Sequence, residues 1–146
     1  MSTSSFLIAP SIQAPAESAT EVPRIICEPE DLKCRVKTEG ERTQWKLSLA
    51  LCESGDNPLA LNKIDVNGTS SIGQWQFQAN SWKYRIRKYK LFNYKSWEPA
   101  DWENTIFSKI HQEIVLDRMI DDPTVTWQNE FPTCIKRVGL PPVAQG

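Results

Sequence analysis

Residues 49–78 read LALCESGDNPLALNKIDVNGTSSIGQWQFQ, and this stretch decides which fold the chain should adopt. It begins as an apolar helix with a single glutamate, Glu53, near its end. Gly55 suits the position just past a helix, and Pro58 cannot continue one. A carboxyl group in the last turn meets the negative end of the helix dipole and, in this sequence, an apolar surrounding. Both disfavour the ionised form, so we expect the pKa of Glu53 to be raised.

Beyond this helix, the segment NKIDVNGTSSI predicts a small β-hairpin, because Asn67-Gly68 favours a tight turn. Apolar residues at helical spacing predict the remaining elements. The first is a largely buried helix over 42–54, with Trp45, Leu49 and Cys52 on an apolar face that Leu47, Ala50 and Leu51 widen. A second helix runs from Asn80 or Ser81 to about Tyr89, and a loop is predicted over 92–99. A long core helix, in which Trp102, Ile106, Ile110 and Ile114 recur, runs from Pro99 to just before Asp122, and a short helix begins at Pro132 and Thr133 and ends at Gly139. The predicted fold class is α+β and mainly helical.

The composition describes one globular domain. The chain has 146 residues, of which 40% are hydrophobic and 24% charged, with six tryptophans. Its net charge of -1 gives no general attraction to nucleic acid or to an anionic membrane. The basic segment KYRIRKYK at 83–90 is interpreted as a solvated helix face whose aromatic residues reach the core, with a nucleic-acid patch as the alternative. No apolar run is long enough to cross a bilayer. We therefore expect neither a nucleic-acid partner nor a membrane span.

The sequence predicts a central domain between two tails. Residues 1–40 should form a mobile N-terminal tail followed by a Cys27/Cys34 loop, because Ser, Ala, Pro and Thr dominate its first part. The domain itself is expected over 41–142, with a short tail at 143–146. The N-terminus lacks a basic segment and has too short an apolar run for a clear signal peptide.

Four cysteines, at 27, 34, 52 and 134, have neither C-x-x-C spacing nor a histidine at metal-binding spacing, so no metal or other cofactor is expected. The lone His111 should serve the surface or core of its helix. Four cysteines permit three pairings. A local Cys27–Cys34 loop leaves Cys52 to pair with Cys134, although Cys52 as a buried thiol is an equal alternative. An even count is compatible with disulfides and an extracytoplasmic location, namely periplasm, cell wall or medium.

Several segments together resemble one known group of proteins. ESGDNPLALN, Glu53 to Asn62, is similar to the E-S-G-x-N-P-x-A-x-N motif of the lysozyme-like superfamily, most closely the soluble lytic transglycosylase type in small secreted bacterial proteins. SSIGQWQF is similar to its Ser-rich turn followed by G-L-x-Q and an aromatic residue, and HQEIVLDRMI and WQNEFPTCIKRVGLP resemble its later segments. The resemblance covers residues 43–142. Gln74 and Trp75 depart from the usual G-L-x-Q element, and the Ala-Glu-Asn-Tyr-Tyr-like motif is missing.

This resemblance implies a lysozyme-like fold with a hairpin beside an active-site cleft. The implied substrate is the glycan strand of peptidoglycan, cut at the β-1,4 bond between N-acetylmuramic acid and N-acetylglucosamine. In lytic transglycosylases one glutamate, here Glu53, acts first as acid and then as base. The C6 hydroxyl of the muramic acid is the nucleophile and leaves a 1,6-anhydro sugar. The chain is expected to act as a monomer without a cofactor.

Two other functions stay open at this stage. A hydrolytic lysozyme (muramidase) would use Asp65 as its second carboxylate, but Asp65 is interpreted first as a turn residue that bonds backbone amides. A non-catalytic module would bind glycan or a partner and leave Glu53 as a solvated helix-end residue. The expected substrate contacts are Gln76, Ser71, Ser70 and Asp65, with Trp75, Phe77 and Trp82 either stacking on sugars or packing in the core.

Overall fold

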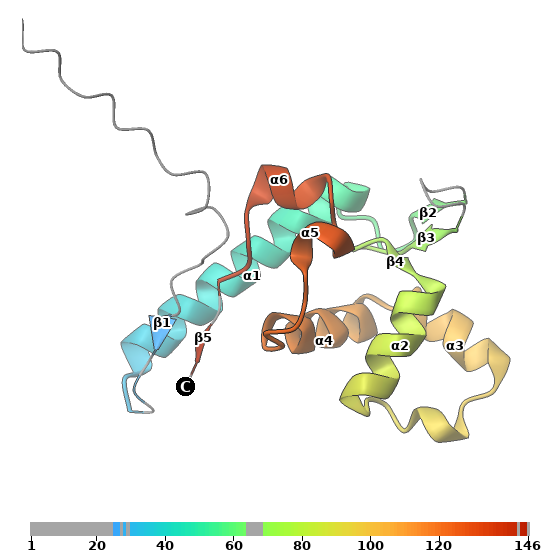
Figure 1. Ribbon diagram of the computed structural model, residues 1–146, viewed down its shortest axis with the longest axis horizontal. Helices are drawn as coiled ribbons and strands as arrows, with labels where there is room; N and C mark the ends of the chain where they lie inside the picture. The colour runs from blue at the N-terminus through green and yellow to red at the C-terminus, as the bar shows by residue number, and fades with distance from the viewer. Residues whose placement is uncertain (1–24, 27, 29, 64–68, 143, 146) are drawn as a thin grey trace, which may run out of the picture.

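The computed structural model describes residues 25–26, 28, 30–63, 69–142 and 144–145 of the chain. It is mainly helical with a small antiparallel sheet, as the sequence predicts (Figure 1). The elements are β1 Ile25–Ile26, α1 Leu32–Ser54, β2 Leu61–Asn62, β3 Ser71–Ile72, β4 Phe77–Gln78, α2 Ala79–Tyr89, the 3-10 helix η2 Tyr94–Ser96, α3 Pro99–Ile106, α4 Lys109–Ile120, α5 Trp127–Glu130, α6 Cys134–Val138 and β5 Ala144–Gln145. No described helix is both long and apolar enough to span a membrane.

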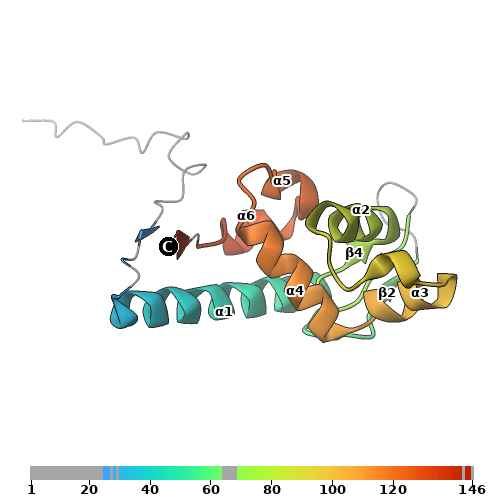
Figure 2. The same cartoon turned by 90° about the horizontal axis from the view of Figure 1, so that it is seen from below.

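Helix α1 starts well before the predicted residue 42. Asp31 caps it, its carboxylate accepting a hydrogen bond from the amide of Cys34 at 3.0 Å. The early turns lack apolar periodicity, which is why the sequence pattern missed them. The predicted domain boundary at 40/41 therefore falls inside α1, whose N-terminal half projects beyond the other helices (Figure 2). The helix ends as predicted, at Gly55 with φ +66°.

The small sheet has three strands in the order β2-β3-β4, all antiparallel. Ile72 is the register partner of both Leu61 and Phe77. The predicted tight turn at 64–68 lies outside the described residues. The second hairpin, β3 to β4, was missed because two-residue strands show no alternation of apolar and polar residues.

The predicted long helix from Pro99 is wrong, because the structure has two helices there. Ser108 interrupts it as the N-cap of α4, its side chain accepting from the amide of His111 at 3.4 Å. The break changes which residues face inward: Ile110 is 69% exposed and Ile114 37% exposed. Gln112, Val115, Leu116 and Met119 are buried in their place.

Other predicted element boundaries differ from the observed ones by about one helical turn. Helix α2 starts after Gln78, without a side-chain cap, so the predicted caps Asn80 and Ser81 lie inside it. The predicted loop at 92–99 contains η2, and α5 was not predicted. Helix α6 agrees with the prediction and ends at Gly139.

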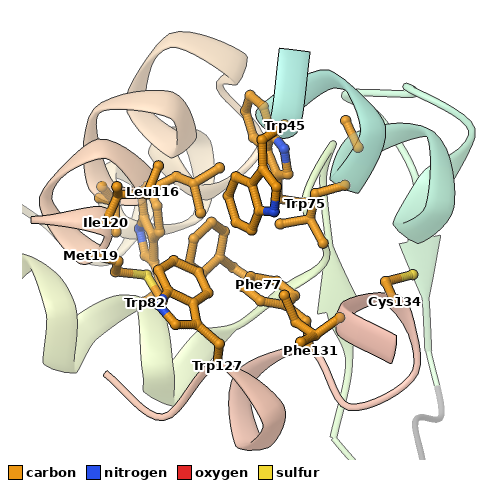
Figure 3. Close-up of a cluster of buried hydrophobic side chains, with 14 of the residues drawn as sticks. Trp45, Trp75, Phe77, Trp82, Leu116, Met119, Ile120, Trp127, Phe131 and Cys134 are labelled. Atoms are coloured by element: carbon orange, nitrogen blue, oxygen red, sulfur yellow. The ribbon is translucent and has the colours of Figure 1, made fainter. Parts of the chain in front are cut away.

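The core is unusually aromatic (Figure 3). Its large members come from every part of the described domain: Trp45, Leu49, Trp75, Phe77, Trp82, Ile86, Leu116, Met119, Trp127 and Phe131. Edge-to-face contacts join Trp45 to Trp127 and Phe77 to Trp82. Leu47 and Leu51 were expected to widen the apolar face of α1, but they are 40% and 55% exposed.

A disulfide and the ion pairs of one lysine connect α1 to its neighbours. Cys52 is disulfide-bonded to Cys134 of α6, which is the pairing predicted for the case that Cys27 and Cys34 form a local loop. The ammonium of Lys46 bonds Glu113 at 2.8 Å and Asp117 at 2.9 Å, both on α4. Cys34 is also disulfide-bonded. These links hold the end of α1 rigidly against the C-terminal half of the domain.

Candidate active site

A cleft of about 300 Å³ lies where the end of α1, the small sheet, the start of α2 and the α5–α6 segment meet. Its lining residues combine hydroxyl, amide and carboxyl groups with two aromatic rings. They include Glu53, Ser71, Gln76, Phe77, Gln78, Ser81, Asn129, Glu130, Phe131, Pro132 and Thr133. The cleft thus joins segments that are far apart in the sequence, and three predicted site residues besides Phe77 are among its walls.

Glu53 lies in the last turn of α1 and is half-buried at the wall of the cleft. The backbone on both sides of it is fixed. Cys52 is held by the disulfide, and the hydroxyl of Ser54 donates to the carbonyl of Gln74 at 2.6 Å and accepts from the amide of Asn57 at 3.0 Å. The end of α1 is therefore tied both to α6 and to the β3–β4 turn. The raised pKa of Glu53 stays a prediction.

Ser71 and Gln76 share the cleft with Glu53, as the sequence analysis expected. Ser71 is only 2% exposed, at the start of β3. Gln76 has a left-handed backbone, φ +54°, and its side-chain amide donates to the carbonyl of Gly73 at 2.8 Å. Phe77 is 3% exposed and contacts Phe131 edge to face, so it is both a core residue and a lining residue of the cleft.

Three of the other candidates, Trp75, Trp82 and Ser70, do not line this cleft. Trp75 is 2% exposed and its indole N–H donates to the carbonyl of Lys46 at 2.9 Å, so of its two interpretations the structure supports packing in the core. Trp82 is buried in the same way. Ser70 does not line the cleft, and its hydroxyl donates to the carbonyl of Lys63 at 3.1 Å. Asp65 lies outside the described residues.

A buried glutamine that the sequence analysis did not single out positions this part of the site. Gln112 of α4 is 0% exposed. Its amide nitrogen donates to the carbonyls of Ile72 at 2.8 Å and Ile106 at 2.5 Å, and its oxygen accepts from the amide of Trp75 at 3.0 Å. Two of these bonds satisfy backbone groups of β3 and the β3–β4 turn, and the third satisfies a carbonyl at the end of α3. The sequence feature that could have indicated this role of Gln112 is a polar residue within an otherwise apolar helix face.

Gly73 is the residue of the turn on which this packing depends. Its φ is +83°, and a Cβ at this position would lie 2.2 Å from the amide nitrogen of Gln112. We expect Gly73→Ala to lower the free energy of unfolding by about 2–3 kcal/mol, through backbone strain and loss of the Gln112 bonds. Urea unfolding would measure it. Gly40→Ala is the control, since a Cβ there meets no atom within 4 Å; equal stability of Gly73→Ala and the parent protein would contradict the role of Gln112.

The α5 side of the cleft carries a second carboxyl group, Glu130, that the sequence analysis also missed. It forms an ion pair with the guanidinium of Arg85, which is 6% exposed. Arg85 also donates to the hydroxyl of Tyr89 at 3.2 Å, and that hydroxyl donates to Asp122 at 2.8 Å. Although burial raises the pKa of Asp122, hydrogen bonds from Lys88 and Thr124 lower it well below its usual range.

The same network includes part of the basic segment 83–90. Arg85 and Lys88 are ion-paired with Asp122, at 3.8 Å and 2.7 Å. Ile86 is in the core. Two of the five cations are therefore bound to acidic residues of the same chain, and Tyr84 is 55% exposed and does not reach the core. Arg85 and Lys88 thus connect α2 to the α4–α5 region.

His111 has no metal partner among the described residues, which contain no group of three His, Cys, Asp or Glu side chains able to hold an ion. Its Nδ1 lies 2.7 Å from the hydroxyl of Ser108, and its ring contacts Phe92 edge to face. Burial lowers the pKa of His111. The imidazole thus belongs to the junction of α3 and α4.

Comparisons with protein-family models, with curated proteins and with solved structures found no match for this chain.

Proposed function

We propose that this protein cleaves the glycan strands of peptidoglycan and that Glu53 is its catalytic acid and base. The proposal rests on the sequence motif around Glu53 together with one structural observation. Glu53 lies at the wall of a cleft of about 300 Å³ that is also lined by Ser71 and Gln76, two of the polar residues expected to contact a sugar. A helix-end glutamate without a function would have no need of a polar cleft beside it.

The chemistry needs a carboxyl group that can give up a proton at near-neutral pH and take one back. In the proposed reaction, the carboxyl of Glu53 protonates the leaving glycosidic oxygen. The resulting carboxylate then accepts the proton of the C6 hydroxyl of the muramic acid as that oxygen attacks C1. The product is a 1,6-anhydro end, and no water is consumed. Ser71 and Gln76 would hold hydroxyl and acetamido groups of the strand.

The preference for this route over hydrolysis comes from the resemblance to lytic transglycosylases, and Asp65, the second carboxylate of the hydrolytic alternative, lies outside the described residues. A hydrolase needs a second carboxylate that serves as nucleophile or activates water. Within the described lining, the second carboxyl group is Glu130, and it is ion-paired with Arg85. The disulfide between Cys52 and Cys134 fits a protein that works in an oxidising place such as the periplasm, the cell wall or the medium.

The products of peptidoglycan digestion should therefore carry 1,6-anhydromuramic ends. Liquid chromatography with mass spectrometry of the muropeptides distinguishes them, since a reducing end is heavier by one water. Asp65→Asn should keep most of the activity, because the transglycosylase reaction does not use Asp65. Reducing ends, together with a folded but inactive Asp65→Asn variant, would instead identify a hydrolytic lysozyme.

A further inference from the structure

We infer that a face at the end of α2 binds the protein to the surface of a bilayer that contains anionic lipid. We call it the basic-aromatic face, and it consists of Lys83, Arg87, Lys90, Lys95, Trp97 and Trp102. The cleft lies at the other end of the same helix, where Gln78 and Ser81 line it. In Figure 1 the chain leaves α2 at the end that points away from α5 and α6. The length of α2, about 16 Å, separates the face from the cleft, and the inference does not depend on the proposed function.

The first argument is that positive charge is concentrated in this part of the chain. Residues 79–97 contain six lysines and arginines and no aspartate or glutamate, whereas the whole chain has a net charge of -1. Arg85 and Lys88 are used by the ion pairs described above. The other four cations of the segment have no acidic partner among the described residues, so they are available to anionic headgroups. Three acidic residues of α3 reduce this attraction and make a second anchor necessary, namely Glu98, Asp101 and Glu103.

The second argument is that the two tryptophans outside the core lie beside these cations. Four of the six tryptophans are buried: Trp45, Trp75, Trp82 and Trp127. Trp97 and Trp102 are half-exposed and contact each other edge to face, with 4.9 Å between the ring centroids. The guanidinium of Arg87 lies over the ring of Trp102 at 5.4 Å. Among the described residues neither indole N–H has a hydrogen-bond partner, and both N–H groups reach the surface. Tryptophan beside lysine and arginine is the combination that a membrane–water interface favours.

The ring arrangement favours lipid over single-stranded nucleic acid, the other polyanion that a basic and aromatic segment suggests. Nucleic acid needs open ring faces on which its bases stack. Here Arg87 covers one face of Trp102, and Trp97 stacks on Phe92 with an angle of 9° between the ring planes. A bilayer surface needs only ring edges and N–H groups at the level of the headgroups.

The test is sedimentation of the full-length protein with vesicles, which does not depend on cleavage. The vesicles contain phosphatidylcholine and phosphatidylglycerol at about 3:1, at about 0.1 M salt, and pure phosphatidylcholine vesicles are the reference. The triple variant Arg87→Gln/Lys90→Gln/Lys95→Gln should lower the partition coefficient on the mixed vesicles by about 10²-fold, since each cation near the surface contributes about fivefold. All three side chains are exposed, so we expect the fold to be retained.

The matched control is Lys109→Gln/Arg118→Gln/Lys136→Gln, which changes the net charge equally at exposed sites on α4 and α6. It should lower the partition coefficient by less than about threefold, because these cations lie outside the proposed contact. An equal loss in the control would mean that net charge and not the basic-aromatic face determines binding, and would overturn the inference.

Brominated phosphatidylcholine in the same vesicles tests the aromatic part of the face, because bromine quenches tryptophan fluorescence only at close range. The parent protein should be quenched, and the quenching should be lost in Trp97→Phe/Trp102→Phe, since the other four tryptophans are buried. Phenylalanine keeps an aromatic ring in the contact between the two residues. Quenching that persists in this variant would overturn the aromatic part of the inference.

The outcomes separate lipid binding from the proposed reaction. Binding to the mixed vesicles that the triple variant at the face weakens supports the inference whether or not the protein cleaves peptidoglycan. Cleavage by a parent protein that does not bind the mixed vesicles would overturn the inference and leave the proposed function standing. Tighter binding to single-stranded oligothymidine than to the mixed vesicles, weakened by the same triple variant, would overturn it as well and assign the face to nucleic acid.

Discussion

Replacing Glu53 by glutamine is expected to lower the rate of peptidoglycan cleavage by at least about 10²-fold while the fold is retained. Glutamine has nearly the same size and can occupy the same half-buried place at the end of α1. It has no proton to give to the leaving oxygen and cannot accept one afterwards, so both halves of the proposed reaction fail. Release of soluble muropeptides from purified cell walls measures the rate, and circular dichroism with thermal unfolding measures the fold.

Glu103→Gln is the matched control for this experiment. Glu103 is an exposed glutamate of α3 and does not line the cleft, so its loss of charge should leave the rate unchanged. Near-parental activity of a folded Glu53→Gln protein would remove Glu53 from the catalytic role. No cleavage by the parent protein, combined with binding of glycan, would point to a non-catalytic glycan-binding module.

Removing the Cys52–Cys134 disulfide is expected to cost about 4–5 kcal/mol of the free energy of unfolding, according to the chain-entropy treatment of a loop of this length. The two cysteines are separated by 82 residues, so their bridge restricts a large part of the unfolded chain. The double variant Cys52→Ala/Cys134→Ala avoids leaving a free thiol. Urea unfolding of the oxidised parent and of the double variant gives the difference.

The same variant should also lower activity in conditions where it is still folded. Cys52 precedes Glu53, and Cys134 follows Thr133, and both Glu53 and Thr133 line the cleft, so the bridge links two of its sides. Val138→Ala is the control, because it removes part of a half-buried side chain of α6 without touching the bridge, and it should cost only about 1 kcal/mol. Equal stability of the double variant and the parent would show that the bridge does not constrain the unfolded chain as assumed.

Local signals in the sequence determined the parts of this protein that depend on few neighbours. Gly55 and Pro58 fixed the end of α1, and with it the position of Glu53 in the last turn. The helical spacing of Trp45 and Leu49 identified a buried face. Each of these follows from backbone conformation or short-range periodicity, which residues close in the sequence specify by themselves.

Only the tertiary structure decided which side chains meet in the cleft. Arg85 and Glu130, which form an ion pair, are 45 positions apart in the sequence, and Gln112 and Trp75, which share a hydrogen bond, are 37 positions apart. Composition and periodicity carry no information about such pairs, because the contacts arise when helices pack and bury polar groups that must then find partners. The break at Ser108 changed which residues of α4 face inward. From the sequence, an aromatic side chain such as Trp75 could either stack on a sugar or pack in the core, and only its burial in the structure decides between the two. Burial, which depends on the whole chain at once, was the deciding quantity.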